Sequence, residues 1–222
     1  MQVLILCGGR GTRLNGERPK PLIEIAGRPI LWHVVSIYAR QGFDRFLLLT
    51  GYRGDEIAAW PDWPAGVSVE CVDTGVDTPS GGRLHAVRDR LDAAFCLAYA
   101  DGVADIDLDA LRARHEDSGA LATMTVVRPR LPFGVAVLDG ARVTGFREKP
   151  VSGEWVNGGF FVLEPGALAY LGPDSVLERE PLEHLARDGA LAAYRHTGFW
   201  RCLDTVKDAA ALEEAGPDRW LA

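Results

Sequence analysis

A glycine-rich segment near the start of the chain, CGGRGTRL at residues 7–14, combines a flexible backbone with two arginines. Its glycines let backbone N–H groups turn toward an anion without obstruction by Cβ atoms. The segment is neither a dinucleotide fingerprint, because Leu14 stands where a third Gly or Ala is required, nor a P-loop, because no Gly-Lys-Ser/Thr follows. A tight solvent-exposed turn is the alternative, although two arginines would be unusual in one. We predict a phosphate-binding loop.

Lys20 follows this segment and lies between Pro19 and Pro21. The two prolines restrict the local backbone, so a stiff segment presents the ammonium group. An isolated lysine is usually a solvated surface charge, and that is the alternative for Lys20. Its position shortly after the glycine-rich segment favours a contact with a bound phosphate.

Two aspartates follow apolar, strand-like stretches: Asp101 comes after residues 94–100 and Asp204 after residues 199–203. Ligands bind at the carboxyl ends of strands in open α/β sheets, so both carboxylates can open onto the same edge of one sheet. Hard oxygen ligands suit Mg²⁺, which takes one or two carboxylates together with substrate phosphates. Spacing alone leaves alternatives: Asp101 can belong to a turn or cap a helix, and Asp204 can cap a helix that begins near Thr205.

The elements that must position these residues read as an α/β pattern. Residues 2–6 form a buried strand, 29–41 a helix and 45–50 a second buried strand, an order that implies a right-handed crossover and a parallel sheet. The pattern continues with helices near 53–59, 83–91 and 107–117 and strands near 67–72 and 94–100. The later chain is richer in strands, near 121–127, 134–138, 142–147 and 156–163, and ends with helices near 180–188 and 205–214.

We expect a single domain over residues 1–222, with a nucleotide half at about 1–118 and a sugar-phosphate half at about 119–222. An Asp139-Gly140 pair between apolar stretches predicts a β-hairpin in the second half. Hydrophobic residues make up 47% and charged residues 25% of the sequence, which excludes disordered and coiled-coil classes.

The net charge of −7 argues against a nucleic-acid surface, because phosphate-backbone binding needs clustered Lys and Arg. The four cysteines lie beside apolar residues and show no CxxC pair, so we expect buried free thiols. The five histidines share no metal-binding spacing, and we expect them to be packing or surface residues. The start of the chain lacks the basic region and cleavage site of a signal peptide, and no apolar run is long enough for a membrane span. These features predict a cytoplasmic protein.

The glycine-rich segment and PKPLIEIAGRPIL together resemble the signature loop of the sugar-1-phosphate nucleotidylyltransferase family. The similarity is nearest to its glucose-1-phosphate cytidylyltransferases. It covers nearly the whole chain through eight further motifs: Asp73-Thr74-Gly75, Thr78-x-Ser80-Gly81-Gly82-Arg83-Leu84, Asp101-Gly102-Val103-Ala104-Asp105, Phe133-Gly134, Phe146-x-Glu148-Lys149-Pro150, Asn157-Gly158-Gly159-Phe160-Phe161, Glu180-Pro181-Leu182 and Gly198-Phe199-Trp200-x-x-x-Asp204-Thr205.

The resemblance implies the residue roles and the fold. The catalytic residues would be Arg13, Lys20 and Asp101. Arg13 would bind the β- and γ-phosphates and Lys20 the α-phosphate. Asp101 and Asp204 would bind Mg²⁺. The fold would be a mostly parallel Rossmann-like, GT-A-like sheet flanked by helices, with a β-richer sugar-binding lobe. The nucleotide-binding set would be Leu6, Cys7, Gly8, Gly9, Arg10, Gly11, Thr12, Arg13, Lys20, Thr78, Gly82, Arg83 and Ala100, and the sugar-phosphate set Gly134, Glu148, Lys149, Asn157, Gly158 and Trp200.

The implied reaction joins a nucleoside monophosphate from an NTP, with CTP as first choice, to a sugar 1-phosphate, with glucose 1-phosphate as first choice. Three departures bear on the choice of base: a short stretch between Arg13 and Lys20, a short stretch between Tyr52 and Asp73, and Ala100 in place of the usual Gly. Guanylyl, thymidylyl or uridylyl transfer, cytidylyl transfer to an alditol phosphate, and a non-catalytic nucleotide-sugar sensor are the alternatives. Assembly into a homo-oligomer is left open.

Overall fold

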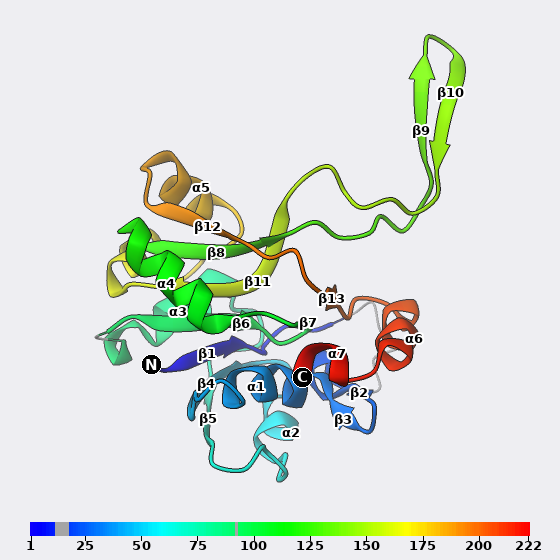
Figure 1. The fold of residues 1–222 in the computed structure, drawn as a ribbon. Coiled ribbons are helices and arrows are strands. Elements are labelled where there is room, and N and C mark those ends of the chain that lie inside the picture. The colour runs from blue at the N-terminus through cyan, green and yellow to red at the C-terminus, as the bar shows by residue number, and fades with distance from the viewer. Residues whose placement is uncertain (12–17, 92) are drawn as a thin grey trace.

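The computed structural model describes residues 1–11, 18–91 and 93–222. Its centre is a seven-stranded sheet (Figure 1). Six strands run in one direction, and β11 runs antiparallel to both of its neighbours, β6 and β8. In spatial order the strands are β12 (Leu191–Arg195), β8 (Ala122–Val127), β11 (Val156–Leu163), β6 (Phe95–Tyr99), β1 (Val3–Leu6), β4 (Arg45–Thr50) and β5 (Ser68–Asp73).

Both faces of this sheet are covered, which explains why its central strands are apolar without alternation. Successive side chains of β1 enter two different cores: Val3 and Ile5 face one, and Leu4 faces the other. Helices α1 (Ile30–Ala39), α2 (Gly54–Ala58), α4 (Leu108–Ser118), α6 (Val206–Ala215) and α7 (Asp218–Leu221) contribute to the first core, and α3 (Ser80–Ala86), η3 (Pro165–Tyr170) and α5 (Glu180–Arg187) to the second.

A small two-stranded ribbon lies beside the sheet, where β7 (Gly102–Ala104) pairs antiparallel with β13 (Trp200–Cys202). Asp101 directly precedes β7, and Asp204 follows β13 by two residues. The ribbon corrects one expectation: Asp204 does not follow a strand of the main sheet, because the 199–203 stretch pairs with β7 instead. The two aspartates are still brought to one place, since Leu203 N donates to Asp101 O at 2.8 Å.

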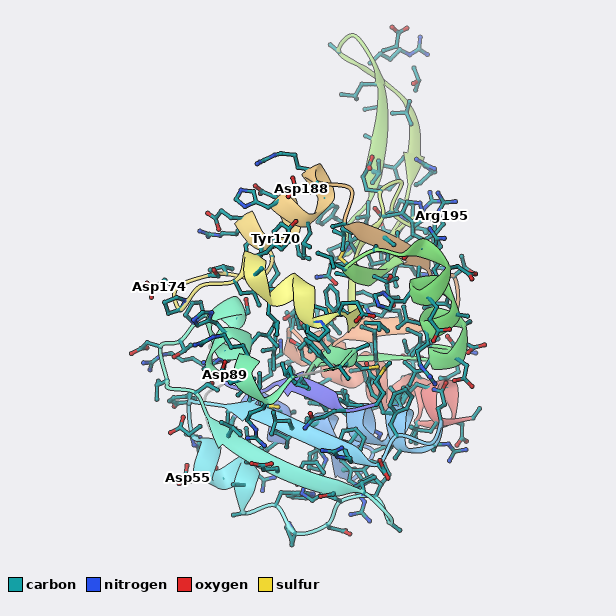
Figure 2. All side chains as sticks on the ribbon, turned by 90° about the vertical axis from the view of Figure 1, so that its left-hand side faces the viewer. Asp55, Asp89, Tyr170, Asp174, Asp188 and Arg195 are labelled. Atoms are coloured by element: carbon teal, nitrogen blue, oxygen red, sulfur yellow. The ribbon has the colours of Figure 1, made fainter. Side chains whose placement is uncertain are left out.

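The hairpin of β9 (Val135–Asp139) and β10 (Arg142–Arg147) stands away from the body of the molecule (Figures 1 and 2). Its turn lies at Asp139-Gly140, as the sequence predicts, and Gly140 has φ +55°. Large apolar side chains on this hairpin and beside it are exposed, with Leu138 64% and Phe146 65% accessible.

Most sequence-predicted elements are present, with bounds shifted by a few residues. The predicted 83–91 helix is wrong in extent: α3 begins at Ser80, and a separate turn η2 (Arg88–Arg90) follows it. The central sheet takes β1, β4, β5 and β6 from the first half of the chain and β8, β11 and β12 from the second. Short elements that the sequence does not reveal are η1 (Lys20–Leu22), β2 (Glu24–Ile25), β3 (Arg28–Pro29), β7, β12 and α7. No helix in the described parts of the chain is long and apolar enough to span a membrane.

Candidate active site

A cavity of about 500 Å³ opens at the carboxyl ends of β1 and β6. Segments far apart in the sequence line it, and they include the glycine-rich loop, Lys20, the start of α3 and the residues after β6. This is the edge of an α/β sheet where ligands are expected. The cavity brings together ten residues of the predicted site: Leu6, Cys7, Gly8, Gly9, Gly11, Lys20, Thr78, Arg83, Ala100 and Asp101.

The glycine-rich loop needs glycine for close approach. Gly11 has φ +56°, and a Cβ there would lie 2.7 Å from the Cβ of Lys20. Gly8 is buried, and a Cβ on it would overlap the guanidinium of Arg83. The loop therefore lies directly against Lys20 and Arg83. The predicted residues Thr12 and Arg13 lie outside the described residues.

Arg83 is 4% exposed and is held by backbone carbonyls. Its guanidinium donates to the carbonyls of Thr50 at 2.7 Å, Gly75 at 2.8 Å and Gly8 at 2.9 Å, and to Thr74 Oγ1 at 2.6 Å. Burial lowers the pKa of Arg83, with only partial compensation from Cys7 and Asp73. The side chain borders the cavity, but its donors tie the glycine-rich loop to the ends of β4 and β5.

Lys20 is the centre of the polar part of the cavity. Its Nζ donates to Asp101 Oδ2 at 2.6 Å and to Asp204 Oδ1 at 2.8 Å. Burial by itself would lower the pKa of Lys20, but the two carboxylates outweigh it and raise that pKa. The ammonium is therefore charged at neutral pH, and the alternative of a solvated surface lysine does not hold, because only 16% of its side chain is accessible.

The geometry around Asp204 also removes the alternative of a helix cap. Thr205 caps α6, because its hydroxyl accepts from Asp208 N while the Asp208 carboxylate accepts from Thr205 N. Asp204 directs its carboxylate to Lys20 and accepts a weak hydrogen bond from Cys202 Sγ at 3.4 Å. Asp101 is followed by β7 rather than by a helix.

The donor set of Asp101 and Asp204 fits Mg²⁺. A single cation, the Lys20 ammonium, already contacts both carboxylates, so the two groups are close enough to share one charge. Within the described residues no group of three or more His, Cys, Asp or Glu side chains could hold a metal. A site of two carboxylates leaves coordination positions for substrate phosphates, which is the usual mode of Mg²⁺ binding.

Five residues outside the predicted site also line the cavity: Pro21, Pro79, Ser80, Tyr99 and Glu178. Tyr99 donates its hydroxyl proton to Glu178 Oε1 at 2.6 Å, and Ser80 Oγ donates to Glu178 Oε2 at 2.6 Å. The position of Tyr99, two residues before Asp101 at the end of an apolar strand, was a usable signal. Glu178 lies in a turn before α5 and carried no signal in the sequence.

The predicted sugar-phosphate residues fall into two groups. Asn157, Gly158 and Trp200 lie near the cavity: Asn157 Nδ2 donates to the Tyr99 hydroxyl at 2.9 Å, and Trp200 Nε1 donates to Gly158 O at 2.8 Å. Gly134, Glu148 and Lys149 lie together at the base of the projecting hairpin, and they are not among the residues lining the cavity.

Two members of the predicted nucleotide set direct their contacts elsewhere. Arg10 forms an exposed ion pair with Asp77 at 2.8 Å. Gly82 packs against residues 173–175, where its N–H donates to Ser175 O at 3.0 Å. A Cβ at Gly82 would overlap the carbonyl of Pro173, so this glycine serves the close approach of α3 to that turn.

The cysteines are free thiols, as the sequence predicts. Cys7 and Cys96 are buried, whereas Cys71 and Cys202 are only partly buried, so the expectation of burial holds for two of the four. Burial raises the pKa of Cys96 to about 12. Burial and the nearby Asp204 carboxylate raise the pKa of Cys202 to about 12. Neither thiol is a nucleophile at neutral pH.

Comparison with known proteins shows the family to which the chain belongs. The family described as the MobA-like NTP transferase domain matches residues 3–198. The glucose-1-phosphate cytidylyltransferase of Salmonella typhi is 37% identical, covering 99% of this chain and 98% of its own length. A Bacillus subtilis protein named "Probable glucose-1-phosphate cytidylyltransferase" is 39% identical, covering 94% and 93%.

Among solved structures, HddC from Yersinia pseudotuberculosis complexed with GMP-PN has the same fold, with a TM-score of 0.77 at 21% identity over 96% of this chain and 98% of that one. The alignment to the Salmonella typhi enzyme runs over 257 residues, more than the 222 of this chain, so that relative has insertions that this chain lacks. The family match spans most of the sequence and contains the cavity residues that precede position 198. The chain belongs to the MobA-like NTP transferase family.

Proposed function

We propose that this protein transfers a cytidylyl group from CTP to glucose 1-phosphate, giving CDP-glucose and pyrophosphate. Near full-length similarity to two proteins named for this activity supports the choice of substrates. The observation that carries the reaction class is the Lys20 ammonium held between Asp101 and Asp204 beside a glycine-rich loop. The cavity lining combines a fixed cation, backbone N–H groups and one candidate metal ligand, Asp101, and the second candidate ligand, Asp204, contacts the same ammonium.

In the proposed reaction a phosphate oxygen of the sugar 1-phosphate forms a bond to the α-phosphorus of the NTP. The bond from that phosphorus to the bridging oxygen of the β-phosphate breaks, and pyrophosphate leaves with the electron pair. The nucleophile is already anionic near neutral pH, so no general base is required. The protein must align the two substrates and stabilise the charge that grows on the α-phosphate.

Lys20 suits the second task, because its position is fixed and its ammonium remains charged. The loop residues Gly8, Gly9 and Gly11 would present N–H groups to the phosphates, and Arg13 would contact the leaving pyrophosphate. Asp101 and Asp204 would hold Mg²⁺, which when bound neutralises phosphate charge. Asn157, which donates to the cavity residue Tyr99, and Trp200, which donates to the carbonyl of the neighbouring Gly158, would orient the sugar.

The test is pyrophosphate release from a matrix of NTPs and sugar phosphates. We expect CTP with glucose 1-phosphate to give the highest kcat/KM. A preference of tenfold or more for another base would overturn the choice of CTP but leave the reaction class intact. Absence of pyrophosphate release with every pair would overturn the reaction class and favour a nucleotide-sugar sensor.

A further inference from the structure

Glu178 places an unneutralised carboxylate at the rim of the cavity. It forms no salt bridge with any residue in the described parts of the chain. Its two oxygens accept from two neutral hydroxyls, Tyr99 and Ser80, on opposite sides of the group. None of the residue roles in the proposed reaction involves this side chain.

The partners of Glu178 are themselves fixed, which orients the carboxylate. Ser80 Oγ accepts from Leu177 N at 2.9 Å, so its proton is free to point at Glu178. The Tyr99 hydroxyl accepts from Asn157 Nδ2, which leaves its proton for Glu178. Burial and the nearby carboxylate raise the pKa of Tyr99 well above its usual value, so the hydroxyl stays protonated.

A carboxylate has about four acceptor positions, and the two hydroxyls occupy two of them. The remaining positions can only accept, because an ionised carboxylate has no proton to donate. Glu178 is exposed, and it shares the cavity with Thr78 and the glycine-rich loop, the nucleotide side of the site. A ligand group that meets it must therefore be a cation or a hydrogen-bond donor, and a nucleotide offers its N–H and O–H groups.

We propose that Glu178 accepts a hydrogen bond from the bound nucleotide and so sets nucleotide specificity. The donor is either the exocyclic amino group of the base or a ribose hydroxyl. This inference rests on the proposed function. Cytosine presents an amino donor where uracil presents a carbonyl acceptor, so a carboxylate at this place accepts CTP and rejects UTP. A ribose hydroxyl would offer the same chemistry from a second part of the nucleotide.

The test compares wild type with Glu178→Gln using CTP, UTP, 2′-deoxy-CTP and 3′-deoxy-CTP. The variant keeps the shape of the side chain but replaces one acceptor with a donor amide. Loss of one hydrogen bond to a charged group predicts a rise in KM for CTP of roughly 10- to 100-fold with little change in kcat. An effect on CTP but not on UTP identifies the base amino group. An effect on CTP and UTP but not on one deoxy analogue identifies that ribose hydroxyl.

Two further variants complete the experiment. Glu183→Gln on the exposed face of α5 is the matched control, and it should leave the KM for every nucleotide unchanged. Ser80→Ala removes one of the two hydrogen bonds that orient Glu178. It should also raise the KM for CTP, by a smaller factor than Glu178→Gln does. Equal effects of Glu178→Gln on every nucleotide, no effect at all, or an effect confined to the KM of the sugar phosphate would overturn the inference. Activity of the wild type in the same assay keeps this outcome separate from failure of the proposed function.

Discussion

Lys20 is the residue on which the proposed chemistry depends most. It is held by two carboxylates, and a triphosphate would bring further negative charge to the same ammonium. For Lys20→Ala we predict a fall in kcat of roughly 10²–10³, the loss typical of one preorganised contact to a developing charge. Steady-state kinetics checks this, with Lys207→Ala as the matched control because Lys207 is exposed. A kcat near the wild-type value in a folded Lys20→Ala variant would contradict the role.

Arg83 has a different role from the one that its motif suggests. Its donors bind carbonyl groups of the protein, so we expect it to hold the glycine-rich loop rather than to contact the nucleotide directly. Arg83→Lys keeps the charge but leaves several buried carbonyls without partners. We predict a KM for the NTP raised roughly tenfold, with kcat less affected, and destabilisation by about 1–3 kcal/mol.

Kinetics together with thermal unfolding separates these effects, and Arg88→Lys on the exposed turn η2 is the control. If Arg83 bound the phosphates directly, the KM effect would appear without a loss of stability. Unchanged KM and unchanged Tm would show that the guanidinium network is unimportant for the loop.

At the scale of elements, the ribbon of β7 and β13 explains how two aspartates about a hundred residues apart meet in one site. Pairing of Cys202 with Gly102 fixes the register, and a slip of one residue would turn one carboxylate away. Asp101→Asn and Asp204→Asn should each lower activity by roughly 10² and shift its Mg²⁺ dependence to higher concentration. The double variant should be little worse than the worse single, because groups that share one task are strongly non-additive.

Mg²⁺ titrations of activity for both single variants and the double variant check this, with Asp218→Asn in the exposed first turn of α7 as control. Additive losses would indicate separate roles. If Asp204→Asn titrates with Mg²⁺ like the wild type, Asp204 serves only to hold Lys20.

The sequence predicts the long elements well because their signals are strong. Apolar runs predicted β1, β4 and β6, and Asp139-Gly140 predicted the hairpin. The β7–β13 ribbon and strand β12 form through tertiary pairing rather than from a local sequence pattern. From the sequence we predict only the strand-like stretch 199–203, and its assignment to the main sheet is wrong. Lys20 and Asp101 were found through motif spacing, whereas Glu178 is an ordinary acidic residue that becomes notable only when the fold places it beside Tyr99 and Ser80.

For the whole molecule, the hairpin of β9 and β10 is the outlying feature (Figure 1). Its side chains Leu138 and Phe146 bury little surface within the chain. Replacing both with Ser should therefore change the stability of the single chain by no more than about 0.5 kcal/mol each. Thermal unfolding at several protein concentrations is the measurement. A large drop in Tm that depends on concentration would instead place these side chains in contacts between copies of the chain.

The proposed function requires that the cavity direct attack at the α-phosphorus of an NTP. The most direct measurement follows ³²P from CTP labelled at the α- or the γ-position, in the presence of glucose 1-phosphate and Mg²⁺. We predict that the α-label appears in the sugar nucleotide and the γ-label in pyrophosphate. Transfer of the γ-label to the sugar phosphate, or its release as inorganic phosphate with no labelled sugar nucleotide, would contradict the account.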